Sequence, residues 1–136
     1  MISAFATTWH QFHQACILLF GIKCDSVESV INFTFENNIS CEWIPLHDWE
    51  SLADIHILEN LPSGSDFSGD LYILAESSYK HFPYKVASDD MVCFASQHLS
   101  YSGECLFNGD LLIFNPVTKE VWLFHHEGLY SNFRLR

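Results

Sequence analysis

The C-terminal third of the chain contains two short apolar runs separated by a turn. The first run extends from Leu111 to Phe114 and the second from Val121 to His125, with Asn115-Pro116-Val117-Thr118-Lys119 between them. Apolar runs of this length that are bounded by turn residues are typical of β-strands. The pattern predicts a β-hairpin, and therefore a sheet with antiparallel pairing in this part of the protein.

Other segments predict further strands. Asp70 to Ala75 follows a Gly-Asp turn and indicates a buried strand, which we expect to pair with a second strand at Tyr84 to Ala87. The stretches Gly69 to Leu74 and Gly109 to Phe114 resemble each other, and shared turn-to-strand chemistry explains this better than duplication. A short strand is expected at 39 to 44, ending before Pro45. The tail from Leu129 to Leu135 fits an edge strand or a short helix.

Helical spacing of apolar residues appears mainly in the first half of the chain. It predicts helices at 3–20, with Gly21 as the C-cap, at 26–37 and at 49–59. A fourth helix should begin at Ser88 and reach Gly103, with apolar residues facing inward at Met91, Val92, Phe94, Ala95 and Leu99. The fold class is therefore α+β, with N-terminal and central helices packed on a mostly antiparallel sheet formed largely by the C-terminal half.

Length and composition indicate one folded unit. The 136 residues fit a single domain, 1–136, and 49% of them are hydrophobic, which suffices for a core without metal or disulfide bridges. The five cysteines are odd in number and lack a C-x-x-C pair, so we expect reduced thiols in the cytoplasm. The apolar stretch near the N-terminus is too short for a membrane span, and no secretion signal is expected.

The charge is strongly negative and unevenly distributed. The chain has 17 acidic and 6 basic residues, for a formal net charge of -11. Between Lys23 and Lys80 there is no Lys or Arg, whereas the same segment holds 11 carboxylates. This field should repel nucleic acid and anionic membranes and attract a basic protein. The alternative is that the acidity only maintains solubility.

The most enzyme-like segment is His125-His126-Glu127-Gly128. Adjacent side chains of a strand point to opposite faces, so His125 and His126 are not expected to share a metal unless a bulge intervenes. Three interpretations stay open: a structural role in which one ring is buried and Gly128 forms the turn, an interface role, or a small metal-dependent hydrolase that uses His125, His126 and Glu127. We expect no catalytic residues, cofactor or bound metal, because no nucleophile motif or phosphate loop is present.

A second pair of histidines lies near the N-terminus. His10 and His13 are three residues apart on the first predicted helix and could reach one ion. No Glu-x-x-His segment accompanies them, so a surface or packing role is the favoured interpretation.

The second half of the chain resembles small bacterial immunity proteins. The resemblance rests on Phe107 to Asp110 and Val121 to Gly128, and extends to Gly69 to Ile73 and the helix from Ser88 to Leu99. These proteins belong to polymorphic toxin and contact-dependent inhibition systems, and some are similar to the SMI1/KNR4-like superfamily. The Leu-Pro segment and Asn-Gly element of that superfamily are missing here. The resemblance implies stoichiometric binding to a cognate toxin domain, often a nuclease or another basic enzyme, and no catalytic residues.

The binding surface has to be inferred from this chain's own residues. Tryptophans among carboxylates can form an aromatic anchor with an acidic rim. The alternative is that both tryptophans are core residues. A third interpretation is an adaptor or self-associating regulator that pairs through a sheet edge near the C-terminus. The toxin-binding residues predicted from the sequence are Glu42, Trp43, Asp48, Trp49, Glu50, Asp54, Asp66 and Asp70.

Overall fold

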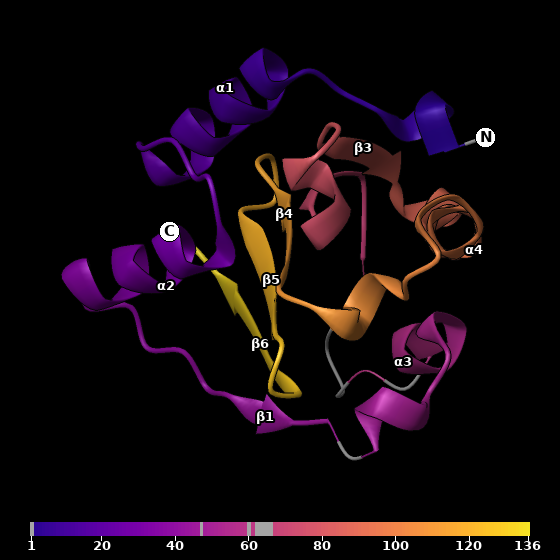
Figure 1. Ribbon diagram of the computed structural model, residues 1–136. Helices are drawn as coiled ribbons and strands as arrows, with labels where there is room; N and C mark the ends of the chain where they lie inside the picture. The colour runs from indigo at the N-terminus through magenta and orange to yellow at the C-terminus, as the bar shows by residue number, and fades with distance from the viewer. Residues whose placement is uncertain (1, 47, 60, 62–66) are drawn as a thin grey trace.

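A central antiparallel sheet is covered by helices on both faces (Figure 1). The computed structural model describes residues 2–46, 48–59, 61 and 67–136. Within these residues there are six strands in the order β1-β6-β5-β4-β2-β3. This confirms the α+β fold. The strands are β1 Ile44–Pro45, β2 Asp70–Leu74, β3 Tyr84–Ala87, β4 Leu111–Asn115, β5 Glu120–His125 and β6 Leu129–Arg134; the α-helices are α1 Trp9–Phe20, α2 Val27–Glu36, α3 Asp54–Glu59 and α4 Met91–Ser102.

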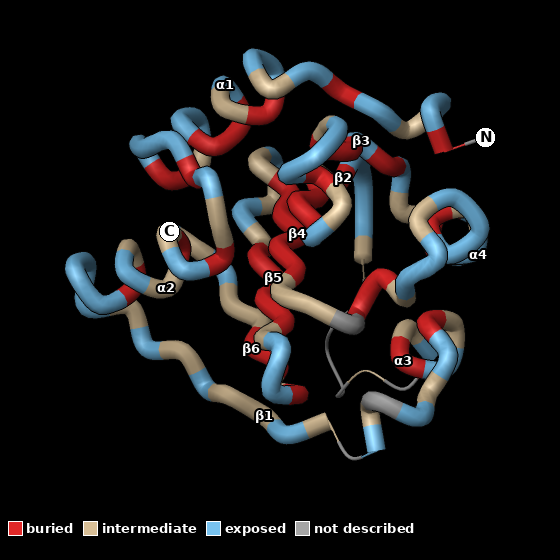
Figure 2. The backbone as a smooth tube through the Cα atoms, in the orientation of Figure 1, coloured by how far each residue is buried: buried red, intermediate tan, exposed pale blue. Residues whose placement is uncertain are grey.

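Alternate side chains of each central strand enter two different cores. On one face, Phe12 of α1 and Val30 of α2 pack with Leu112 and Leu123. On the other face, Phe94 of α4 lies in the core that contains Trp122. Because helices cover both faces, inward and outward positions are both apolar. This explains the continuous apolar runs of β4 and β5, which are buried throughout their centres (Figure 2).

The predicted hairpin is confirmed. β4 pairs with β5 from Leu111↔Phe124 to Asn115↔Glu120, and β5 pairs with β6 along its whole length. The predicted pairing of β2 with β3 is also confirmed. The tail forms a strand rather than a helix, and it is flanked by β1 for two residues at its start.

The first two helices begin at side-chain caps. Thr8 accepts a hydrogen bond from the Gln11 amide at the start of α1, and Ser26 does the same for Ser29 at the start of α2. Residues Ile2–Phe5 form a separate 3-10 helix, so the predicted helix 3–20 consists of two elements. Gly21 ends α1 with φ +76°, as predicted. Among the described residues, no helix is long and apolar enough to cross a membrane.

Two predicted elements between residues 39 and 59 are wrong in extent. The strand contains Pro45, which tolerates pairing because β1 is an edge strand and needs no amide there. The helix expected at 49–59 is divided into the 3-10 helix Trp49–Ser51 and α3, because Leu52 is extended with φ -93° and ψ 140°.

The helix that follows β3 differs from the prediction in which residues it buries. Ser88–Asp90 form a 3-10 turn, and α4 then runs to a left-handed Gly103. Val92 and Leu99 are exposed, which corrects their assignment to the core. His98 occupies the buried position instead, one turn after Phe94, because helical spacing and not polarity decides which side faces the sheet.

Candidate functional site

The turn between β5 and β6 brings two histidine rings together. The Gly128 amide donates to the His125 carbonyl at 2.9 Å, and Gly128 has φ +82°, so residues 126–128 form a three-residue hairpin loop. β5 ends at His125, and the alternation of a strand therefore does not extend to His126. The ring centroids lie 4.1 Å apart at 30°. The expectation that the two side chains point to opposite faces is wrong.

Asp110 holds this turn in place from the start of β4. Its Oδ1 atom accepts hydrogen bonds from the backbone amide and from Nδ1 of His126, both at 2.9 Å. The Asp110 amide in turn donates to Glu76 Oε1 at 3.3 Å. The hydrogen bond to Asp110, with the nearby charges of Asp110, Glu127 and Glu76, raises the pKa of His126 above its ordinary value. Asp110 was not among the site residues predicted from the sequence, although it belongs to the repeated Gly-Asp pattern.

One side-chain nitrogen or oxygen from each of Asp110, His125 and His126 lies within 4.8 Å of the other two. Among the described residues, this is the group of three potential metal ligands that the fold assembles. Glu127 is close by, with Oε2 at 3.9 Å from Nδ1 of His125. The arrangement can bind a cation or a positively charged side chain, and the His126 ring is 58% exposed.

The two predicted anchor tryptophans lie at this same end of the sheet. The Trp43 ring meets the His125 ring edge-on at 6.4 Å. The Trp49 indole lies so close to Gly128 that a side chain on Gly128 would overlap it. The Leu46 amide also donates to the Gly128 carbonyl at 2.8 Å. Both tryptophans are half-buried, so each contributes to packing and still presents part of its ring to solvent.

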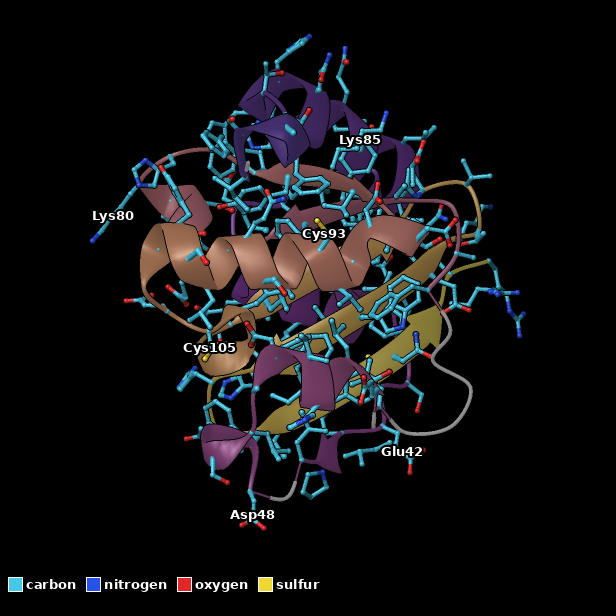
Figure 3. The ribbon with its side chains drawn as sticks, turned by 90° about the vertical axis from the view of Figure 1, so that its right-hand side faces the viewer. Glu42, Asp48, Lys80, Lys85, Cys93 and Cys105 are labelled. Carbon is cyan, nitrogen blue, oxygen red and sulfur yellow. The ribbon has the colours of Figure 1, made fainter. Side chains whose placement is uncertain are left out.

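We call this region the β5–β6 turn end, defined by Trp43, Trp49, Asp110 and residues 125–128. Glu42 and Asp48, which neighbour the tryptophans in sequence, are exposed. Figure 3 shows both carboxylates at the same end of the molecule, away from Lys80 and Lys85. The tryptophans with their acidic neighbours and the segment 125–127, which were predicted as candidate sites for different reasons, therefore belong to one surface.

The structure separates the other predicted binding residues from this surface. Asp54 is buried, and its carboxylate accepts hydrogen bonds from the amides of Leu106 and Phe107 at 2.8 and 3.3 Å. It caps the 3-10 helix Leu106–Asn108, and its burial corrects the prediction that Asp54 is a toxin-binding residue. Asp70 is exposed, but at the opposite end of the sheet, where β2 pairs with Ala87. Asp66 and the side chain of Glu50 lie outside the described residues.

The acidic segment as a whole does not form one face. α2 covers one side of the sheet and α3 the other, and the chain passes around the sheet edge through β1 between them (Figure 1). The absence of cations between Lys23 and Lys80 therefore produces a diffuse negative field. Of its described carboxylates, Glu42, Asp48 and Glu76 lie at the β5–β6 turn end.

The N-terminal histidines have a structural environment. His13 Nε2 lies 2.9 Å from Asp25 Oδ1, joining α1 to the start of the next helix, and its ring is tilted against Trp9. This agrees with a surface and packing role.

A buried polar network that the sequence did not predict connects α4 to β3. Nε2 of His98 lies 2.8 Å from Ser77 Oγ, which lies 2.8 Å from the Tyr84 hydroxyl. Burial lowers the pKa of His98 and therefore favours the neutral ring. The network joins α4 to β3 and satisfies polar groups within the core. Nothing in the local sequence marks it, because His98 lies 21 residues after Ser77 and on a different element.

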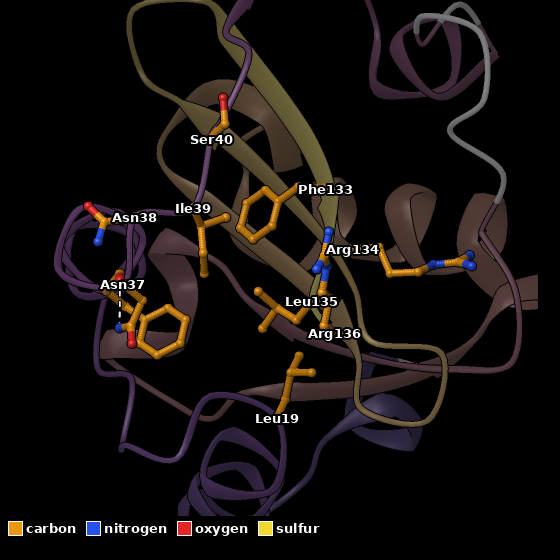
Figure 4. Close-up of a pocket in the computed structure, with 10 residues that line it drawn as sticks. Leu19, Asn37, Asn38, Ile39, Ser40, Phe133, Arg134, Leu135 and Arg136 are labelled. Atoms are coloured by element: carbon orange, nitrogen blue, oxygen red, sulfur yellow. Dashed lines mark hydrogen bonds between the residues drawn. The ribbon is translucent and has the colours of Figure 1, made fainter.

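A hollow of about 580 Å³ lies at the other end of β6 (Figure 4). Leu19, Phe33 and Leu135 contribute to its apolar lining, and Arg134 at its rim is paired with Glu120 at 2.7 Å. None of Asp110, His125 and His126 lines this hollow. The candidate site is thus an exposed turn and not an enclosed pocket.

Comparison with known proteins yields no match, whether to a family model, to a curated protein or to a solved structure. The class that the fold defines is an α+β protein whose antiparallel sheet is covered on both faces by helices.

Proposed function

We propose that this chain is a cytoplasmic immunity protein that binds a cognate basic toxin domain and blocks it by stoichiometric contact. The observation that carries the proposal is the β5–β6 turn end, where two half-buried tryptophans lie beside exposed carboxylates. Partly exposed aromatic rings supply most of the binding energy in many interfaces, and a charged rim steers the partner and fixes its orientation.

The geometry also supports a protein partner over a small substrate. The histidines and Glu127 belong to the end of a hairpin and its turn, and Asp110 lies against them from the start of β4, so a partner's surface can contact the group from outside. The wider negative field would accelerate association with a basic domain, and this effect should weaken as salt increases.

The test is binding and protection with the toxin domain encoded next to this chain's gene. The variant Glu42→Lys/Asp48→Lys/Glu127→Lys should weaken the complex by roughly 10- to 100-fold, since rim charges act together on a basic partner. Cells that produce the toxin should lose protection in proportion. Isothermal titration calorimetry and survival assays measure the two effects.

A matched control reverses the same number of charges elsewhere. Glu28→Lys/Glu36→Lys/Asp70→Lys has the identical net charge but leaves the β5–β6 turn end intact. Its affinity in physiological salt should remain within a few-fold of the wild type, because the Debye length is then about 8 Å. Equal losses in both variants would show that net charge, and not this surface, determines binding.

A further inference from the structure

Asp110, His125 and His126 form a ready set of metal ligands. Their candidate atoms all lie within 4.8 Å of one another, and Nδ1 of His126 is 2.9 Å from Asp110 Oδ1. Zinc binds imidazole nitrogen and carboxylate oxygen at about 2.0–2.2 Å, which places two ligands of a tetrahedral site about 3.3 Å apart. Small movements of these side chains, of which His126 is exposed and Asp110 and His125 are half-buried, would bring the three atoms to that spacing.

We propose that Asp110, His125 and His126 bind one divalent transition-metal ion, with zinc as the foremost candidate. Two imidazoles and one carboxylate suit a borderline metal such as zinc, copper or nickel, whereas calcium and magnesium prefer oxygen ligands alone. This inference is independent of the proposed partner, because it concerns the isolated chain.

The backbone holds the ligands in position without the ion. The His126 amide donates to the Asp110 carboxylate, and the Asp110 amide donates to Glu76, so the start of β4 and the β5–β6 turn are tied together. Gly128 beneath Trp49 limits the shapes that the turn can adopt. Supporting hydrogen bonds of this kind orient metal ligands and strengthen binding.

Three protein ligands leave a coordination position open. The Glu127 side chain, which is exposed and lies near His125, can reach this position, as can water or a side chain of another protein. Glu76 and Glu127 add negative charge around the site, which favours a cation there.

The experiment is a calorimetric titration of zinc chloride into the full chain, prepared without a polyhistidine tag. One zinc should bind per chain, and zinc should raise the melting temperature of the wild type. Asp110→Asn and His126→Gln should each weaken zinc binding by at least roughly 10-fold, in keeping with the sensitivity of metal sites to changes near their ligands. Circular dichroism of the metal-free variants verifies that they fold.

His13→Gln is the matched control, because His13 also contacts a carboxylate at 2.9 Å but lies outside this group of three. It should bind zinc like the wild type. Cobalt(II) spectra distinguish this site from the cysteines, since thiolate ligands give an intense charge-transfer band that imidazole and carboxylate do not. Absence of binding in excess zinc, undiminished binding by the Asp110 and His126 variants, or a thiolate band would overturn the proposal.

Discussion

The two hairpin turns at the ends of β5 share a left-handed residue and a side-chain oxygen that accepts backbone amides, but they differ in how much of that side chain is exposed. In each turn a residue adopts a left-handed conformation, Lys119 with φ +66° and Gly128 with φ +82°. In each, a side-chain oxygen accepts backbone amides: Asn115 from Val117 and Thr118, and Asp110 from His126. The two turns differ in what the other side-chain polar atoms of Asn115 and Asp110 contact.

The side-chain amide nitrogen of Asn115 also forms a hydrogen bond within the fold. It is buried, and its Nδ2 donates to the Ser68 carbonyl at 2.6 Å, which ties the β4–β5 turn to the residues before β2. The Asp110 side chain, by contrast, is 29% exposed and accepts a hydrogen bond from the His126 ring at the surface. A buried amide closes a turn, while a half-exposed carboxylate supports a turn and still leaves a group that can bind other molecules.

The largest expected effect tests how firmly the β5–β6 turn is held. Gly128→Ala should destabilise the protein by about 3 kcal/mol, because a left-handed residue other than glycine costs about 1–2 kcal/mol and overlap with Trp49 adds about 1–3 kcal/mol. Denaturant unfolding measures the change. Gly21→Ala has a similar φ, +76°, with open space around it, and should show the conformational part alone.

A loss no larger than that of Gly21→Ala would mean that Trp49 moves aside easily. The contact between Trp49 and Gly128 would then not hold the β5–β6 turn in a single conformation.

The next effect concerns the turn at the other end. Asn115→Ala should cost about 2 kcal/mol, since it removes three hydrogen bonds from a buried site. Asp110→Asn retains an acceptor for the His126 amide and should cost less than about 1 kcal/mol. Both variants are measured by denaturant unfolding. Equal losses of unfolding free energy would contradict the view that Asn115 is needed mainly for stability and Asp110 mainly for binding.

The smallest effect is a pH dependence confined to the β5–β6 turn end. The pKa of His126 is raised in the folded chain, so its pairing with Asp110 stabilises the fold fully below pH 6.5. This contribution disappears as pH rises through the raised pKa. A nuclear magnetic resonance titration of the His126 ring should show the shift, and Asp110→Asn should return the pKa toward its ordinary value.

If Asp110→Asn left the titration unchanged, Glu127 and Glu76 would be responsible instead.

Much of the fold was predictable because it follows from local patterns. The apolar runs Leu111 to Phe114 and Val121 to His125, separated by turn residues, required a buried hairpin, and Ser26 and Gly21 marked helix ends through their own chemistry. The errors occurred where the backbone or the packing of a helix departs from what the apolar pattern suggests. Leu52 is extended and interrupts the expected helix. Helical spacing buries His98 one turn after Phe94, and Ser77, 21 residues away, supplies its hydrogen-bond partner.

The candidate site was only partly predictable. His125, His126 and Glu127 were noticed for their chemistry, and Trp43 and Trp49 for their acidic neighbours. Their proximity could not be foreseen, because about 80 residues separate the two groups and β1 brings them together by pairing with β6. Asp54 shows the converse, because a carboxylate that looked exposed in sequence caps a 3-10 helix 52 residues later.

The sequence by itself determined the β2–β3 pair, the β4–β5 hairpin, most helices and the negative charge, since these depend on residue type and short spacings. Tertiary structure alone decided which carboxylates gather at one end and which are buried. It also decided that His125 and His126 lie side by side. The physical reason is that a strand's alternation holds only while the strand continues, and the point at which β5 turns is set by Asp110, Trp49 and Gly128 from three separate parts of the chain.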